Sequence, residues 1–457
     1  MTAGSEHVSG GEDRHVQADV IVVGAGVAGL AAARALAERG MRVLALEARD
    51  RIGGRIFTER TADGVLVEHG AEFVHGRDPA LWDLIREAGV RTVERDGSML
   101  REEEPGAGLV SEEPEDSRDE VSGGLLALAD LPGEDVSFAE WLAGSDVPEW
   151  QRAAMTGYVE GFNAADAERI SARSLGIQQR AEEASEGDRS WHLPGGYAQI
   201  PEFLAEHARA AGAEVRLRSE VLAIRWRPGH VVVSTRQGDL RAPKCVITLP
   251  LGVLQAANAS APGSVRIEPE PRALFEARRM AMGAVVRFTL VFRERWWERA
   301  ARPAPEALQT MSFLFTRDRM PPVWWTRHPE PETLPTLTGW VGGPRAGALQ
   351  GKTAEDLGEI ACRELSAAFA LPEEVIRAAL VSTHTYDWSA DPSAKGAYSY
   401  VVAGALDAPE AMTIPEADTL FFAGEHTDTT GNWGTVHAAF GSGLRAAGQI
   451  AGKPDWM

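Results

Sequence analysis

The sequence predicts an α/β fold whose first unit is Rossmann-like. A short run rich in β-branched residues, 19–23, is followed at residues 27–39 by alanine and leucine at helical spacing, and a second strand-like run occupies residues 42–47. Strand, glycine turn, helix and strand within about 30 residues form a parallel βαβ unit. Because 457 residues exceed the size of one ordinary core, we expect a second domain as well.

The turn between this first strand and the helix carries three glycines, Gly24, Gly26 and Gly29, in the spacing G-x-G-x-x-G. Such glycines permit a tight turn, the close approach of a pyrophosphate and close helix packing, while the amides at the helix start bind negative charge. Glu47 ends the second strand about 20 residues further on, where a carboxylate accepts hydrogen bonds from a ribose. The glycine motif alone is a weak signal. Together with strand, helix and acid it predicts a dinucleotide site, without separating NAD from FAD.

Two further segments are expected to complete this site. Gly54 belongs to a glycine pair between arginines, and we expect the pair to pack against the cofactor while Arg49 and Arg55 meet its phosphates. Solvated surface arginines are the alternative. Near the C-terminus, a predicted strand ends in Gly424 and Glu425, which are able to bind ribityl or ribose hydroxyls.

The rest of the chain alternates between the same domain and two excursions. The expected segments, in chain order, are a mainly helical excursion, a return to strands, a second excursion, and a final strand and helix: 79–189, 214–248, 266–380, 419–423 and 435–451. Within the first excursion, the acidic stretch 102–119 is expected to be a solvated loop. The second excursion contains an alternating strand at residues 285–292 and two tryptophan pairs.

Composition excludes several classes of function. The formal net charge of -21 argues against a nucleic-acid partner, whose phosphates need basic patches, and suits the attraction of small cations. Cys245 and Cys362 are too few for a disulfide framework or a cysteine-built metal site, and no metal is expected. Residues 1–18 are polar and are expected to form a disordered tail. Because no apolar run suggests a signal peptide or a membrane span, we expect a cytoplasmic protein.

These segments together resemble the flavin-containing amine oxidase family. The resemblance covers nearly the whole chain through the following stretches: 22–29, 47–55, 68–76, 248–254, 388–398 and 423–447. It implies FAD rather than NAD. It also implies a Rossmann-like FAD-binding domain built from discontinuous segments, 19–78, 190–265 and 388–457, beside a mixed α/β substrate-binding domain of residues 79–189 and 266–387.

The resemblance also implies positions for residues that bind the cofactor. The backbone of Val221 would meet the adenine, and Trp388 would pack near the flavin. A helix that begins near Thr435 would direct its positive end at the flavin and stabilise the reduced, anionic form. Further cofactor residues implied are Gly70, Ala71, Glu72, Phe73 and Val436. Ala397 stands where family members with a tethered flavin have a cysteine, so we expect non-covalent FAD.

The chemistry of the family implies the catalytic groups. An amine oxidase moves a hydride equivalent from the carbon next to nitrogen to the flavin, water hydrolyses the imine, and oxygen reoxidises the flavin to give hydrogen peroxide. Arg287 falls where polyamine oxidases use a lysine to hold a water near the flavin, and we expect it to support reoxidation. A strand arginine paired with a carboxylate is the alternative. Tyr398 matches one of two rings that flank the flavin in monoamine oxidases, and Thr435 replaces the second.

The space left by this threonine favours an extended or secondary amine, such as a polyamine. We expect His75 in the substrate tunnel, where it and Glu160 could contact a second, distant amino group. An L-amino-acid oxidase is an alternative, for which Arg77 or Arg345 would bind the substrate carboxylate. A flavin-bound protein without turnover is another. Histone demethylation is disfavoured by the acidic composition and the lack of a long helical insertion. The expected partners are a small amine and oxygen, with no nucleic acid and no membrane, for a monomer or homodimer.

Overall fold

The computed structural model describes residues 16–102, 108–112, 123–316, 318–331 and 333–452. Of the tail predicted at residues 1–18, residues 1–15 lie outside this part of the chain. Gln17 donates its backbone N–H to the carbonyl of Arg241 at 3.1 Å, and Ala18 is buried. These two residues therefore belong to the folded body rather than to a tail.

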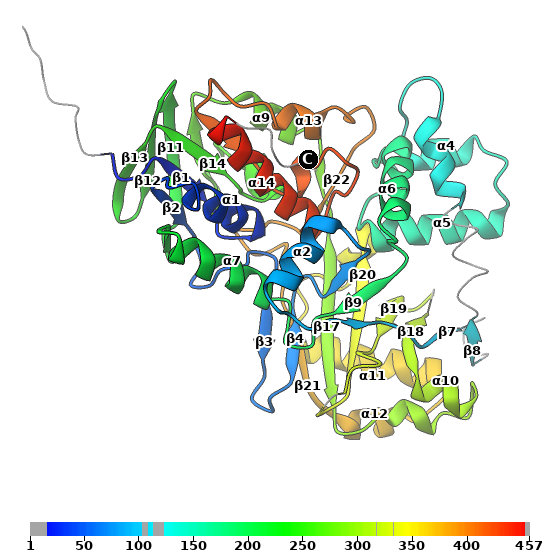
Figure 1. Cartoon of the computed structure of the whole chain (residues 1–457). Helices are drawn as coiled ribbons and strands as arrows, with labels where there is room; N and C mark the ends of the chain where they lie inside the picture. The colour runs from blue at the N-terminus through cyan, green and yellow to red at the C-terminus, as the bar shows by residue number, and fades with distance from the viewer. Residues whose placement is uncertain (1–15, 103–107, 113–122, 317, 332, 453–457) are drawn as a thin grey trace, which may run out of the picture.

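A five-stranded parallel sheet forms the centre of the first body (Figure 1). Its order is β10-β2-β1-β14-β23, and every neighbouring pair is parallel. Strands β1, β2 and β23 are buried at every position, as expected for a sheet covered on both faces. The strands come from three separated parts of the chain: β1 (Val20–Val23), β2 (Val43–Leu46), β10 (Glu214–Arg216), β14 (Lys244–Ile247) and β23 (Leu420–Phe422). The predicted βαβ unit and α/β fold are confirmed.

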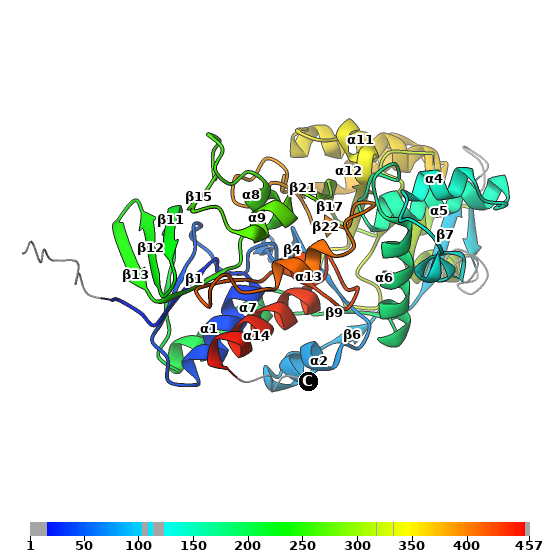
Figure 2. The same ribbon diagram turned by 90° about the horizontal axis from the view of Figure 1, so that it is seen from above.

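Helices cover one face of this sheet and a second sheet covers the other. Helices α1 (Val27–Ala37), α7 (Gln199–Ala210) and α14 (Val436–Ala451) pack on the first face, and both Figure 1 and Figure 2 show α1 beside α14. A Cβ at Gly443 would lie 2.1 Å from the carbonyl oxygen of Ala28, so these two helices approach closely. On the second face lie a sheet of order β13-β12-β11-β15 and three short helices: β11 (Val221–Arg227), β12 (His230–Thr235), β13 (Gly238–Ala242), β15 (Arg266–Glu268), α8 (Leu251–Gln255), α9 (Arg272–Ala277) and α13 (Ala408–Met412).

A seven-stranded sheet of order β21-β17-β20-β19-β18-β7-β8 forms the second body, in the lower part of Figure 1. The strand predicted at residues 285–292 is confirmed as β17 (Val285–Phe292). Buried tryptophans and helices α10 to α12 fill its core. The remaining elements are β7 (Ser98–Glu102), β8 (Leu109–Glu112), β18 (Met311–Phe315), β19 (Val323–Trp325), β20 (Thr336–Gly342), β21 (Leu380–Thr385), α10 (Pro305–Gln309), α11 (Ala354–Phe369) and α12 (Glu373–Ala379).

The first excursion is less helical than predicted. Strand β7 and strand β8 pair with each other, so the expected loop at residues 102–119 is wrong for Leu109–Glu112. Residues 103–107 and 113–119 of that stretch lie outside the described part. The helices of this excursion gather at the right of both views and share one apolar cluster: α4 (Phe138–Ala143), α5 (Glu149–Phe162) and α6 (Ala172–Ala184). Helix α2 (Pro79–Glu87) precedes them.

Three small sheets complete the fold and position the candidate site. They are β3 (Thr58–Arg60) with β4 (Leu66–Glu68), β5 (Phe73–His75) with β9 (Ser190–His192) and β6 (Val93–Glu94), and β16 (Ala281–Met282) with β22 (Ser399–Tyr400). The domain boundaries at residues 79, 190, 266 and 388 stay a prediction. Within the described ranges, no helix combines the length and the apolar character needed to cross a bilayer.

Candidate active site

A glycine cradle follows β1. Gly24 has φ +104°, a left-handed conformation that favours glycine, and α1 begins three residues later. A Cβ on Gly29 would lie 2.0 Å from the carbonyl oxygen of Gly24, so only glycine lets the helix start this close to the strand. A Cβ on Gly54 would approach the Cα of Gly26 to 3.3 Å. The glycines of both predicted segments therefore meet at the start of α1, where shape and polarity fit a pyrophosphate.

Glu47 lies after β2 with its carboxylate directed at this cradle. Its two oxygens accept the backbone N–H groups of Ala25 and Arg49, each at 3.0 Å. Its own carbonyl accepts the N–H of Ser219 at 2.8 Å, which brings the start of β11, and so Val221, to the same edge. Because a carboxylate offers about four acceptor positions, Glu47 keeps capacity for ribose hydroxyls. The cradle and this donor and acceptor set fit a dinucleotide.

The two arginines predicted to meet phosphates have protein partners in this structure. Arg49 pairs with Asp391 at 2.7 Å. Arg55 donates to the carbonyl of Ala397 and to the carboxylate of Glu425, each at 2.8 Å. Both guanidinium groups thus tie the N-terminal segment of the site to the C-terminal one. Phosphate contact by either arginine stays a prediction.

Glu425 is the buried acceptor at which several segments meet. It follows Gly424, whose φ of +140° favours glycine, and it accepts hydrogen bonds from the Ser399 hydroxyl and from the N–H of Gly434 at 3.0 Å. Burial alone would raise the pKa of Glu425, but the charge of Arg55 and these hydrogen bonds hold it below its ordinary value. The carboxylate is therefore ionised, and it connects Arg55 to the turn that precedes α14.

Gly70 is enclosed by backbone and by an indole ring. A Cβ there would lie 1.8 Å from the carbonyl oxygen of Arg55 and 3.3 Å from Cζ2 of Trp388. Ala71 donates its N–H to the same Arg55 carbonyl at 3.2 Å, and the Trp388 indole donates to the carbonyl of His69 at 2.7 Å. The structure therefore brings Gly70, Ala71 and Trp388 together beside Arg55, and their shared role in binding the cofactor stays a prediction.

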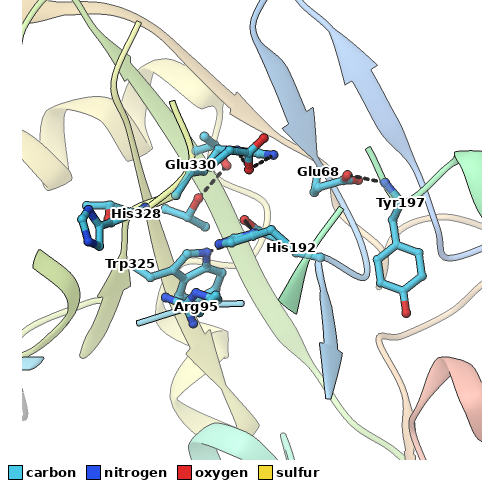
Figure 3. A network of polar contacts seen from close by, with 12 residues as sticks. Glu68, Arg95, His192, Tyr197, Trp325, His328 and Glu330 are labelled. Atoms are coloured by element: carbon cyan, nitrogen blue, oxygen red, sulfur yellow. Dashed lines mark hydrogen bonds and ion pairs between the residues drawn. The ribbon is translucent and has the colours of Figure 1, made fainter. Parts of the chain in front are cut away.

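Glu72 and Arg287 form a buried ion pair next to this segment. The Trp325 indole donates to Glu72 at 3.0 Å, and Nδ1 of His192 lies 3.6 Å from it; Figure 3 shows both of these neighbours. Burial alone would raise the pKa of Glu72, but Arg287 and His192 lower it to about 2. Phe73 packs its ring edge against His192 and Trp325, at 5.1 and 5.4 Å between ring centroids.

Arg287 adopts the alternative arrangement given in the sequence analysis, that of a strand arginine paired with a carboxylate. Its Nη1 donates to the carbonyl of Gly70 at 2.6 Å, while Nη2 bonds the carboxylate of Glu72. The arginine is buried rather than partly exposed, and its charge is compensated. Because Gly70 is itself a predicted cofactor residue, Arg287 reaches the site through this segment. Its role in catalysis stays a prediction.

Tyr398 and Thr435 lie side by side at the start of α14. A Cβ on Gly434 would lie 3.1 Å from Cδ2 of the Tyr398 ring, whose hydroxyl donates to the carbonyl of Phe162 at 2.6 Å. Thr435 is the N-cap of α14, because its hydroxyl accepts the N–H of Ala438 at 3.1 Å. The helix thus begins at Val436, as predicted, with its free amide groups at this end.

His75 belongs to the same region through its contact with Phe162. The two rings meet edge to face, with 5.9 Å between their centroids. Burial, followed by the charge of nearby His437 and Arg95, lowers the pKa of His75 to about 4. The imidazole is therefore neutral at physiological pH. A neutral ring does not repel an approaching ammonium group.

Glu160 lies on a different face of α5 from Phe162. Two residues correspond to a turn of roughly 200° around a helix, so the two side chains diverge. A Cβ on Gly343 would lie 3.2 Å from the Cβ of Glu160, and Arg345 and Asp166 are its charged neighbours. Burial, and then Asp166, raises the pKa of Glu160. No contact found among the described residues joins Glu160 to His75, and their shared contact with a distant amino group stays a prediction.

Sequence reasoning missed three residues that the structure places in the site. Ser399 and Asp391 complete the partners of Glu425 and Arg49, and both belong to the stretch 388–398 or follow it directly. Phe162 joins Tyr398 to His75. It lies in the excursion predicted to be mainly helical, and nothing in its spacing indicated that contact.

Comparisons with known proteins agree with this geometry. The family model for flavin-containing amine oxidoreductases matches residues 27–451. Polyamine oxidase 3 of Oryza sativa subsp. japonica is 28% identical over 465 residues, which cover 93% of this chain and 88% of that protein. Lysine-specific histone demethylase 1B of Mus musculus is 27% identical over 474 residues. That match covers 94% of this chain but 52% of the demethylase, so the chain spans about half its length.

Solved structures share the fold. A putrescine oxidase bound to putrescine has a TM-score of 0.79 at 22% identity, covering 96% of this chain and 100% of that one. Cyclohexylamine oxidase from Brevibacterium oxydans has a TM-score of 0.78 at 24% identity, with 95% and 99% covered. The glycine cradle, the carboxylate of Glu47 and a family match over nearly the whole length lead to one conclusion. The chain belongs to the flavin-containing amine oxidoreductase family, with FAD as its cofactor.

Proposed function

We propose that the enzyme oxidises a C–N bond of an extended amine, a polyamine or another N-substituted amine, with oxygen as acceptor and hydrogen peroxide as product. When bound, FAD takes up the hydride equivalent from the carbon next to nitrogen and passes the electrons to oxygen. The observation that carries the proposal is the wall at α14. The Tyr398 ring stands beside Gly434, and the small capping Thr435 follows. This wall leaves room for a substituent on the amine nitrogen.

The residues around Tyr398 suit the delivery of a neutral amine. A free alkylammonium has a pKa of roughly 10, so the substrate must lose a proton before oxidation. The Tyr398 ring face attracts the cation, and the surroundings of neutral His75 and Phe162 then favour its uncharged form. The names of relatives such as rice polyamine oxidase 3 support the same substrate class.

Arg287 is proposed as a positioning residue that supports reoxidation by oxygen. Its bonds to Gly70 and Glu72 fix the segment that encloses the predicted flavin site. Arg287→Met should therefore slow reoxidation more than anaerobic flavin reduction, measured by stopped-flow absorbance of the flavin. Equal slowing of both steps would indicate a general structural role.

The geometry disfavours an amino-acid oxidase. Arg77 is 45% exposed and lies over Trp82 and Trp191, with Glu186 at 3.6 Å. Arg345 donates to the carbonyl of Arg319 at 3.0 Å. Neither arginine that was considered for a substrate carboxylate lies beside Tyr398. Amine oxidation therefore requires fewer changes in the positions of these side chains than amino-acid oxidation does.

A peroxide-coupled screen of the purified holoenzyme tests the proposal. Spermidine and N-substituted amines should give higher kcat/KM values than benzylamine, and L-amino acids should give none. Tyr398→Ala should lower kcat/KM sharply for every amine. Thr435→Tyr, which narrows the wall, should shift the ranking toward benzylamine. The proposal is wrong if benzylamine is the best substrate and Thr435→Tyr leaves the ranking unchanged.

A further inference from the structure

An aromatic column runs along α5 away from Tyr398. The Tyr398 hydroxyl bonds the carbonyl of Phe162, and the Phe162 ring is 40% exposed although it is large and apolar. One helical turn earlier, Tyr158 stacks on it with 5.2 Å between centroids and 18° between planes. With His75 at the edge of Phe162, these rings form a continuous apolar surface that starts at the proposed site of oxidation.

The column ends at a carboxyl group, that of Glu182 on α6. Its hydrogen-bond partners are the Tyr158 hydroxyl and the Nε2 of Gln178, the latter at 3.0 Å. Both partners are neutral, and no ion pair to Glu182 is found in the described chain. Burial raises the pKa of Glu182 to about 7. Ionising this partly buried carboxyl among neutral groups is costly, and a cation that arrived beside it would lower that cost.

A second acceptor lies in the same place. The Asn163 side chain is 6% exposed, its Nδ2 donates to Oε1 of Gln178 at 2.7 Å, and its Oδ1 has no partner among the described residues. Asn163, Gln178, Tyr158 and Glu182 lie around one closely packed gap between α5 and α6. The Gln178 amide bonds both side chains, because it donates to the Glu182 carboxyl and accepts from Nδ2 of Asn163, and it fills the space between them. A ligand group must therefore displace that amide.

We propose that Glu182 and Asn163 bind a second, protonated amino group of the substrate, so that the enzyme selects diamines and polyamines over monoamines. This inference rests on the proposed amine oxidation and names its substrate more closely. An ammonium group has three N–H donors, which the Glu182 carboxylate and Asn163 Oδ1 accept, while the Tyr158 ring offers its face. Glu182 thereby takes the role that the sequence suggested for Glu160.

The test compares amines that differ only in the second amino group. Octanediamine, which is long enough to follow the ring column, is measured against octylamine with the FAD-bound enzyme. In Glu182→Gln the diamine-to-monoamine ratio of kcat/KM should fall about ten- to a hundredfold, the size of one lost charge-assisted hydrogen bond. Asn163→Ala should lower the same ratio less. Glu183→Gln, an exposed neighbour on α6, should keep the wild-type ratio.

The diamine-to-monoamine ratio of kcat/KM distinguishes this proposal from the general proposal of amine oxidation. An unchanged ratio in Glu182→Gln, or an equal loss for both amines, would overturn the assignment of Glu182. If no amine reduces the flavin anaerobically, amine oxidation itself fails, and calorimetric titration with octanediamine then decides: binding by wild type that Glu182→Gln loses supports the site, and any other result overturns it. Should Glu182→Gln fold poorly, Tyr158→Phe removes a partner of the same carboxyl and should also lower the ratio.

Discussion

At the scale of single residues, the ion pair of Arg287 with Glu72 makes a quantitative prediction. Both side chains are buried, and each is the closest charged partner of the other. Arg287→Met leaves a buried carboxylate without that partner. We therefore expect the free energy of unfolding to fall by roughly 3–5 kcal/mol, the usual cost of breaking a buried pair. Urea unfolding of the FAD-bound enzyme, followed by tryptophan fluorescence, measures the loss.

The matched control removes both charges. The double variant Glu72→Gln with Arg287→Met should recover most of the lost stability, because no unpaired charge remains. If the double variant is as unstable as Arg287→Met alone, the energy resides in the arginine's bond to the Gly70 carbonyl instead.

Glu182 makes a pH prediction with a defined sign. Its pKa in the folded state is about 7, against 4.5 for an ordinary glutamate. Between these values the folded state binds more protons than the unfolded state, so the contribution of Glu182 to stability falls as pH rises through this window. Glu182→Gln removes that dependence. In amine-free buffer near pH 8, about one pH unit above the folded-state pKa, the Tm of Glu182→Gln should exceed that of wild type. This difference in Tm should shrink toward pH 5.

Differential scanning fluorimetry at both pH values checks this expectation, with Glu183→Gln as the exposed control. A Tm difference of the same size at both pH values would mean that packing, rather than ionisation, separates the glutamine variant from wild type.

At the scale of elements, helix α14 depends on its cap. The Thr435 hydroxyl accepts the N–H of Ala438 at 3.1 Å and donates to the carbonyl of Asn432 at 2.7 Å. Thr435→Ala should lower the free energy of unfolding by about 1 kcal/mol, whereas Thr435→Ser keeps the hydroxyl and should cost less than half of that. Chemical denaturation of the three proteins tests this. Equal losses for serine and alanine would show that the threonine methyl group, not the cap, matters.

Elements with a strong local pattern could be predicted, and those fixed by partners could not. Strand β17 has the bounds predicted, since its apolar and β-branched residues encode a strand by themselves. Strand β8 was expected to be a loop because its surroundings are acidic, and it is a strand because β7 supplies the pairing. The start of α14 was predicted near Thr435 from its helical pattern, and the structure places the first helical residue at Val436 with Thr435 as the N-cap.

The site shows the same division. The glycine turn and Glu47 were predictable, because spacing along a βαβ unit fixes their geometry. The partners of Arg49 and Arg55 lie 342 and 370 residues away, and no local rule chooses among the many acids of this chain. The sequence analysis named Glu160 and did not consider Glu182, because a helical pattern does not tell which face of a helix meets the site.

At the scale of the whole molecule, FAD should be held without a covalent bond. Ala397 precedes Tyr398, and Cys245 and Cys362, the two cysteines of the chain, are buried in the cores of the two bodies. Acid precipitation should therefore release the yellow colour into the supernatant. Flavin that stays with the protein pellet, and shows as a fluorescent band after denaturing electrophoresis, would contradict this expectation.

The central sheet takes its last strand from near the end of the chain, which has a consequence for biosynthesis. A ribosome adds roughly 5–20 residues per second, so β14 waits on the order of ten seconds or more for β23 to emerge. During that time the nascent chain exposes one edge of the sheet and the apolar face of α1 that α14 later covers. A nascent chain in this state is a client for a chaperone. If Glu425 and the start of α14 contact the flavin as predicted, flavin loading must wait until they have emerged, long after β14 has been made.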